Sequence, residues 1–202
     1  MYISTKLALL LTFSTLALTP LRAEVQQVVL TWQPGLCRES CVNMLQRELG
    51  KIRGMVKVEI DAGGGRGYLT WGPKEPFSFA PLNAATRFVG IRIDLVLLTV
   101  RGRIVQQGNQ IRLKSEGDGT LFTLINPVIP EPNRAAVIHN AQSRPLSPQL
   151  RDSLLQAMKE DSLVVIQGPF FEPHRSPPNY LTVEKVTVEP KISKPKSSQG
   201  RP

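Results

Sequence analysis

The spacing of the apolar residues alternates between two periods over residues 28–93, and this alternation constrains the fold more than any other feature. Residues 28–32, 56–60 and 68–71 have strand-like patterns, and residues 91–100 form an apolar run typical of a buried strand. Helical spacing occurs at Val42, Leu45, Leu49 and Ile52, and again in a short segment that begins near Pro81. The predicted order is strand, helix, strand, strand, helix, strand.

This order is that of the ferredoxin-like fold, in which two helices cover one face of a four-stranded antiparallel sheet. Glycines 63–65 separate the second and third predicted strands, so these strands should form a hairpin. A phosphate-binding loop is not indicated, because no helix begins after these glycines. We therefore expect a ferredoxin-like βαββαβ domain over residues 24–97.

The second half of the chain has a different pattern, that of a small barrel. Strands are predicted at 100–105, 111–113 and 121–125, with a bulge or bend at Gly102. After a proline-bearing connection (126–146), Ser147 and Pro148 are typical of a helix start, and strands follow at 163–166 and 181–188. Three strands, a helix and two strands is the order of the OB-fold. The expected class is α+β, with an OB-like β-barrel domain over residues 98–189.

The two ends of the chain differ in composition from the predicted domains. Residues 1–23 have one basic residue before an apolar run (7–18), then Pro20 and a small Ala23, which predicts a cleaved signal peptide. No other stretch is long and apolar enough to span a membrane. We therefore expect a periplasmic or secreted protein.

The net charge of +9 is concentrated at these ends. Lys6 and Arg22 contribute two of the nine charges and the tail (190–202) four, which leaves +3 on the predicted domains. The tail is rich in Pro, Ser and Lys, so we expect it to be a solvated, disordered basic segment. This distribution, together with the predicted secretion, argues against a nucleic-acid partner.

The protein has two cysteines, Cys37 and Cys41, at the start of the first predicted helix. The helix N-terminus and Arg38 both favour the thiolate form, and soft thiolates select Cu(I), Zn(II) or Hg(II). An oxidising compartment instead favours a Cys37–Cys41 disulfide. The residues leave the metal site and the disulfide open as alternatives.

Residues 28–93 resemble the heavy-metal-associated domain, a ferredoxin-like module of copper and mercury carriers. The resemblance rests on Gly35, on Cys41 at the helix start, and on the segments 52–56, 57–61 and 88–90. It implies that two thiolates bind a soft metal ion. The family loop reads Gly-Met-Thr-Cys-x-x-Cys; here Cys37 occupies the Thr position, Arg38 the first Cys position and Leu36 the Met position, so one ligand matches and the other is displaced.

These observations predict a non-catalytic binding protein. The first hypothesis is a carrier that holds copper, mercury or zinc at Cys37 and Cys41 and exchanges it with a donor or acceptor protein. The second is an envelope interaction module with a Cys37–Cys41 disulfide, which binds a protein or glycan through the barrel. A third, thiol-disulfide exchange, lacks the Cys-x-x-Cys motif. We expect no enzyme activity, because the sequence has no nucleophile elbow, catalytic triad, His-x-x-x-His or paired-carboxylate motif, and His139 and His174 are predicted loop residues.

Overall fold

The computed structural model describes residues 25–35, 37, 39–127, 140–141 and 144–189. The predicted signal peptide, the basic tail, Leu36, Arg38 and His139 lie outside these residues. No helix in the described ranges combines the length and the hydropathy of a membrane span.

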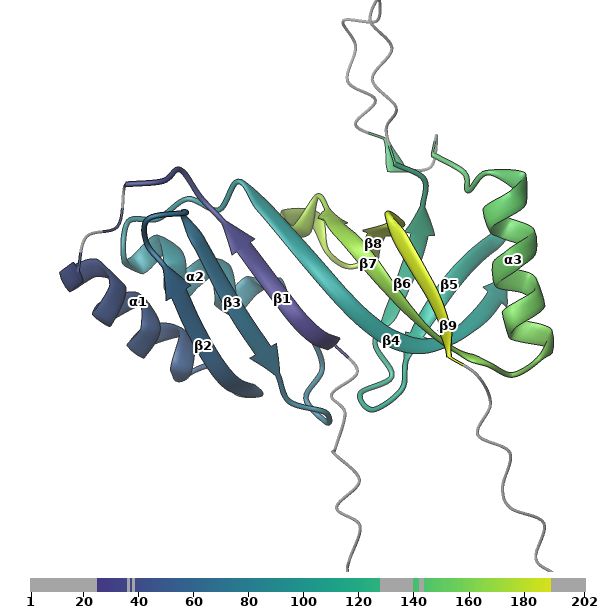
Figure 1. The fold of residues 1–202 in the computed structure, drawn as a ribbon, viewed down its shortest axis with the longest axis horizontal. Helices are drawn as coiled ribbons and strands as arrows, with labels where there is room; N and C mark the ends of the chain where they lie inside the picture. The colour runs from purple at the N-terminus through teal and green to yellow at the C-terminus, as the bar shows by residue number, and fades with distance from the viewer. Residues whose placement is uncertain (1–24, 36, 38, 128–139, 142–143, 190–202) are drawn as a thin grey trace, which may run out of the picture.

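The described part of the protein is a mixed α+β structure with a closed five-strand β-barrel and three α-helices (Figure 1). In sequence order, the elements are β1 (Val25–Thr31), α1 (Glu39–Gly50), β2 (Met55–Asp61), β3 (Arg66–Trp71), α2 (Phe79–Phe88), β4 (Leu95–Gln107), β5 (Gln110–Ser115), β6 (Leu121–Ile125), α3 (Pro148–Lys159), β7 (Leu163–Phe171), the 3-10 helix η2 (Pro173–Arg175), β8 (Asn179–Thr182) and β9 (Lys185–Glu189).

The N-terminal part is a sheet in the order β4-β1-β3-β2, in which every neighbouring pair is antiparallel. The predicted hairpin through the glycines is present, because β2 and β3 pair up to Asp61 and Arg66. Helices α1 and α2 lie beside this sheet (Figure 1), and the apolar stripe of α1 buries Leu45 and Leu49 completely. Burying two leucines contributes several kcal/mol, at about 1.5–3 kcal/mol each.

The C-terminal part is the barrel, whose strands follow the order β4-β5-β6-β8-β7 and close through pairing of β7 with β4. Strands β6 and β8 are parallel, and the other pairs in the barrel are antiparallel. Helix α3 connects β6 to β7 and begins as predicted, since the Ser147 side chain accepts a hydrogen bond from the Leu150 N–H at 3.3 Å.

One long strand, β4, belongs to both parts. The sequence predicted separate strands at 91–100 and 100–105, but the structure has a single strand of 13 residues. Its first half pairs with β1 and β7, and its second half with β5 and β7. The boundary expected between residues 97 and 98 therefore falls inside a continuous strand. A shared strand couples the two parts mechanically, because β4 cannot leave one sheet without disrupting the other.

The last predicted strand, 181–188, is divided into β8 and β9 by a one-residue change of register against β7. Phe170 of β7 pairs with Leu181 of β8, and Gln167 of β7 pairs with Lys185 of β9. The β8–β9 side therefore has one residue more than β7 between these two pairs. Gly168 lies opposite this extra residue, and a Cβ at Gly168 would approach the Thr182 carbonyl oxygen to 1.9 Å. The irregularity depends on a glycine at this point of the barrel.

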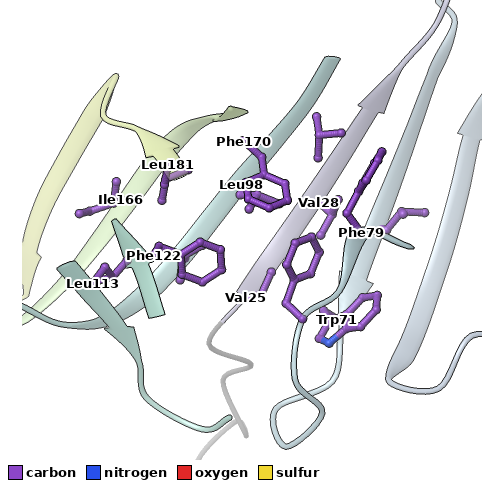
Figure 2. Close-up of a cluster of buried hydrophobic side chains, with 14 of the residues drawn as sticks. Val25, Val28, Trp71, Phe79, Leu98, Leu113, Phe122, Ile166, Phe170 and Leu181 are labelled. Atoms are coloured by element: carbon purple, nitrogen blue, oxygen red, sulfur yellow. The ribbon is translucent and has the colours of Figure 1, made fainter. Parts of the chain in front are cut away.

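The hydrophobic core is one cluster that includes residues of α1, α2 and the barrel. Figure 2 shows the part of it that extends from Trp71 and Phe79 to Ile166 and Leu181. An aromatic cluster joins the two parts at Phe77, in the connection before α2. The Phe77 ring centroid lies 5.4 Å from Trp71, 6.3 Å from Phe122 and 5.7 Å from Phe170. These distances are typical of favourable aromatic pairs. One residue of the connection thus packs against the N-terminal sheet and the barrel at once.

Candidate functional site

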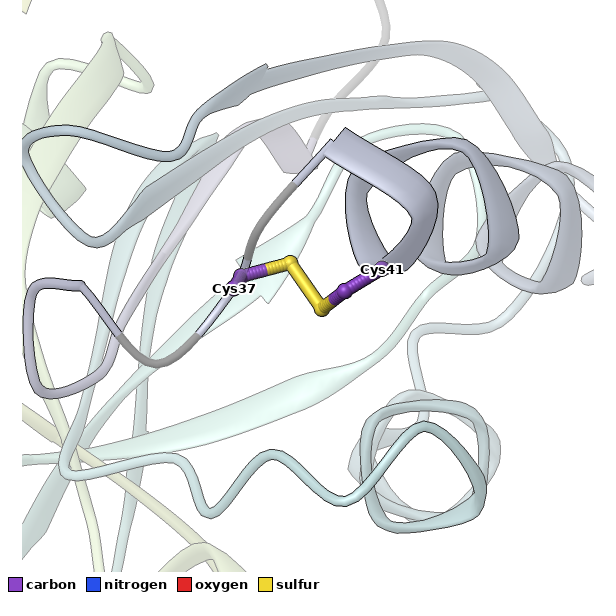
Figure 3. The surroundings of a disulfide bond; sticks show 2 residues. All are labelled: Cys37 and Cys41. Atoms are coloured by element: carbon purple, nitrogen blue, oxygen red, sulfur yellow. A yellow bond between two sulfur atoms is a disulfide. The ribbon is translucent and has the colours of Figure 1, made fainter.

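The two cysteines form a disulfide in the loop that leads into α1 (Figure 3). Their Cα atoms are 5.2 Å apart, and the described residues contain no free cysteine. Cys37 is almost fully buried in the hydrophobic core, and Cys41 is partly buried in the first turn of α1. The bond therefore fixes the loop to the helix.

The disulfide uses both sulfur atoms that the metal hypothesis requires as thiolates. In this state neither Cys37 nor Cys41 is a thiolate ligand. The described residues also contain no group of three or more His, Cys, Asp or Glu side chains that could hold a metal ion. His174, in η2, packs its ring against Phe79 with centroids 5.2 Å apart. Metal binding at Cys37 and Cys41 would first require reduction of the bond.

We predict that the double variant Cys37→Ala/Cys41→Ala folds and loses about 2 kcal/mol of unfolding free energy. The bond closes a short loop, with a sequence separation of 4, so its removal frees few conformations of the unfolded protein. Urea unfolding of the variant and of the wild type measures this difference. Reduced wild-type protein is the control and should show a similar loss. A variant that does not fold would show that the disulfide is required for the fold.

A second candidate site is a cavity of about 590 Å³ between the barrel and the connection to α2. We call it the junction pocket; it is lined by residues 77–80, Asn83, Arg112, 120–121, Thr123, 173–174 and 176–179. Its floor is formed by the outer side of β5 and β6, where Arg112 pairs with Thr123. The segment between β7 and β8 forms one wall, and the start of α2 forms another. The pocket size is within the range of ligand-binding cavities.

Among the described residues that line the pocket, Arg112 alone has a permanently charged side chain. Its Nη2 donates to the Gln110 side-chain oxygen at 2.8 Å. Its Nε is buried and has no hydrogen-bond partner within the part of the protein that the structure describes. No carboxylate in the described ranges forms a salt bridge with Arg112. Because the Nε is buried, a ligand does not reach it in this geometry, and Arg112 contributes to the pocket through the charge of its guanidinium.

Asp118, in the turn between β5 and β6, fixes the barrel to the connection that forms the pocket wall. Its carboxylate accepts hydrogen bonds from the Phe77 N–H at 3.1 Å and from the Thr120 N–H at 3.3 Å. It also accepts hydrogen bonds from the hydroxyls of Ser115 and Thr120. These bonds use both carboxylate oxygens, and they hold Phe77 in place beside the pocket.

We expect Asp118→Ala to lower the free energy of unfolding by about 1–3 kcal/mol, because it leaves the Phe77 N–H without its acceptor. Chemical denaturation measures the loss. The control is Asp152→Ala on the exposed side of α3, which should change stability by about 0.5 kcal/mol or less. Equal stability of both variants would show that Asp118 does not connect the two parts.

The aromatic and basic residues of the barrel strands differ in exposure. Phe122 and Phe170 are buried in the core, whereas Lys114 is exposed on β5. Of that set, Arg112 alone lines the junction pocket. The pattern of β5, which alternates buried and outward residues, places Arg112 on the outer side of the barrel. The role of Asp118 had no sequence signal beyond its position in a glycine-flanked turn.

Another cavity, of about 510 Å³, lies near α3 and is lined in part by the buried Arg144, which is hydrogen-bonded within the protein. Arg144 Nε and Nη2 donate to the Asn126 carbonyl oxygen at 2.9 and 2.6 Å, and the guanidinium lies 4.8 Å from the Phe171 ring centroid. Burial lowers the pKa of Arg144 below its usual value. These contacts give Arg144 a structural role, so the junction pocket is the stronger candidate site.

No protein-family model matches this sequence, and no curated protein has a significantly similar one.

Proposed function

We propose that this protein is a non-catalytic protein-interaction module of the cell envelope, which binds its partner through the outer side of the barrel at the junction pocket. The observation that carries the proposal is Arg112, a partly buried side chain that carries the permanent positive charge among the described lining residues of a cavity formed by both parts of the fold. The predicted signal peptide is the basis for placing the protein in the periplasm or outside the cell.

Two fold assignments belong to the proposal. The order β4-β1-β3-β2, with antiparallel neighbours and two helices, supports a ferredoxin-like N-terminal part. The order β4-β5-β6-β8-β7, with α3 before β7, supports an OB-fold. OB-folds bind ligands at their second and third strands and the flanking loops. Here these strands are β5 and β6, which form the floor of the junction pocket.

The disulfide favours the interaction module over the metal carrier. A carrier of copper, mercury or zinc needs two reduced thiols that can exchange ligands, whereas the module needs a loop of fixed shape. In the proposed function, the heavy-metal-associated scaffold is retained at residues 28–93 and the Cys37–Cys41 bond stabilises it without binding metal.

Site-specific photo-crosslinking in the native host tests the proposed surface. A benzoylphenylalanine residue replaces Leu121, an exposed residue of β6 that lines the junction pocket. The matched control replaces Val56, which is also an exposed apolar residue but lies on β2, the strand at the end of the sheet order and outside the barrel. We expect a discrete protein adduct from position 121 and none from position 56. No adduct at 121, or the same adducts from both positions, would contradict the proposal.

A further inference from the structure

We propose that the junction pocket binds a carboxylate carried by an apolar peptide segment, with Arg112 as the counter-ion. This inference rests on the proposed function, because it specifies the chemistry of the partner at the same surface. The carboxylate belongs either to an acidic residue or to the C-terminus of a peptide, and the experiment below distinguishes the two.

The charge of the pocket selects an anion. Among the described residues, Arg112 is the permanently charged group of the lining, and no Asp or Glu lines the cavity. Asp118 lies close in the sequence, but its oxygens already accept four hydrogen bonds. Glu172 and Arg175, which flank the wall, pair with each other at 3.2 Å. An anion in the pocket therefore meets one uncompensated positive charge.

The geometry of the guanidinium favours a carboxylate. An arginine presents parallel N–H donors that match the two oxygens of a carboxylate, and this pairing is among the strongest in proteins. The Arg112 Nε is buried, so a carboxylate in the pocket would bind the terminal nitrogens of the guanidinium, of which Nη2 also donates to the Gln110 side chain. A single arginine also balances the single charge of a carboxylate, whereas a phosphate group would retain excess negative charge.

The remaining walls favour a peptide over a sugar. Leu121, Pro177 and Pro178 give the pocket apolar surface beside Arg112. Phe77 and Phe79 also line it, but both rings are almost fully buried and pack edge-to-face against other aromatic rings. The described lining contains no Trp or Tyr, and its exposed ring is the imidazole of His174, which packs edge-to-face with Phe79, so it offers no Trp or Tyr face on which a sugar ring could stack. An aliphatic side chain next to the carboxylate fits this surface.

The start of α2 adds hydrogen-bond donors to the same cavity. Ser78 occupies the N-cap position without a side-chain hydrogen bond to the helix, and the first residues of α2 line the pocket. The positive end of the helix dipole therefore faces the same space as Arg112. This arrangement strengthens the preference for an anion that Arg112 establishes.

The test is nuclear magnetic resonance of the full mature protein with three peptide probes at millimolar concentration. The first is Ala-Leu-Glu-Ala with acetylated and amidated ends, the second is the same peptide with Gln in place of Glu, and the third is acetylated Ala-Leu-Ala with a free C-terminus. The Arg112 Nε–H resonance reports binding, because it responds to an anion held at the neighbouring terminal nitrogens of the same guanidinium. We expect it to shift with a carboxylate-bearing probe and not with the Gln probe. A shift with the first probe identifies the carboxylate of an acidic residue, and a shift with the third a C-terminal one.

Variants separate the contact from a general effect of charge. Arg112→Gln should weaken the binding of the active probe by about tenfold or more, because a charge-assisted hydrogen bond is lost. Arg112→Lys, which keeps the charge but loses the planar pair of terminal nitrogens, should also weaken it. Lys114→Gln removes the same charge two residues away on β5 and is the matched control, with an expected change of about twofold or less. Unchanged amide resonances of core residues confirm that each variant is folded.

The inference is overturned if no probe shifts the Arg112 Nε–H, if the Gln probe binds as well as the Glu probe, or if glucuronate binds more tightly than every peptide. These results leave a crosslink at position 121 unaffected, so the interaction module could stand while its ligand chemistry is wrong. Conversely, carboxylate binding without a crosslink at position 121 would support a carboxylate site in the junction pocket and contradict the proposal that a protein binds there.

Discussion

Phe77→Ala is expected to lower the free energy of unfolding by about 3–5 kcal/mol, a large part of the stability of a protein this size. The Phe77 ring is 6 % exposed and packs against Trp71 in the N-terminal sheet and against Phe122 and Phe170 in the barrel. Its removal leaves a cavity where the two parts meet. Guanidinium unfolding, followed by tryptophan fluorescence and by circular dichroism, measures the loss.

Phe88→Ala is the matched control for this prediction. Phe88 ends α2 and is 71 % exposed, so its truncation should change stability by about 0.5 kcal/mol or less. Because the core and β4 are shared, we expect a single transition for wild-type protein by both probes. Two separate transitions in the wild type, or equal stability of the two variants, would show that Phe77 does not couple the sheet to the barrel.

Gly168→Ala is expected to destabilise the barrel by about 3 kcal/mol or more. The added Cβ would lie 1.9 Å from the Thr182 carbonyl oxygen, which is backbone and cannot rotate away as a side chain would. Strand β8 would have to move away from β7, and the barrel closure would weaken. The thermal midpoint of unfolding measures this effect.

Gly50→Ala, at the end of α1, is the control for the added methyl group. A Cβ at Gly50 meets no atom within 4 Å, and alanine is the better helix former, so this variant should be neutral or slightly stabilising. If Gly168→Ala is as stable as Gly50→Ala, the register change between β8 and β9 does not depend on glycine.

The sequence predicted the elements well where a local pattern determines them. The stripe of Leu45 and Leu49, the cap at Ser147 and the hairpin through the glycines each depend on residues close in the sequence, and each is present in the structure. The order of strands and helices predicted an α+β protein with a barrel for the same reason. Local periodicity reports burial on one face without reference to the rest of the fold.

The sequence did not predict the features that depend on contacts between residues far apart in the chain. Nothing near residue 100 shows that β4 continues from the sheet into the barrel, because Gly102 interrupts the apolar pattern there, whereas in the structure Gly102 lies within β4 opposite Ser115 and Val164. The division between β8 and β9 depends on how Gly168 faces Thr182. The pocket likewise combines Arg112 with the start of α2 and the segment before β8, which are far apart in the sequence. Such contacts follow from the closed topology and have no local signal.

The most direct test of the proposed function is a count of free thiols in mature protein purified from its native compartment under conditions that prevent thiol exchange, with metal content measured on the same sample. The interaction module predicts no free thiols at Cys37 and Cys41 and no bound copper, zinc or mercury. Two free thiols together with a stoichiometric amount of one of these metals would contradict it and establish the metal carrier instead.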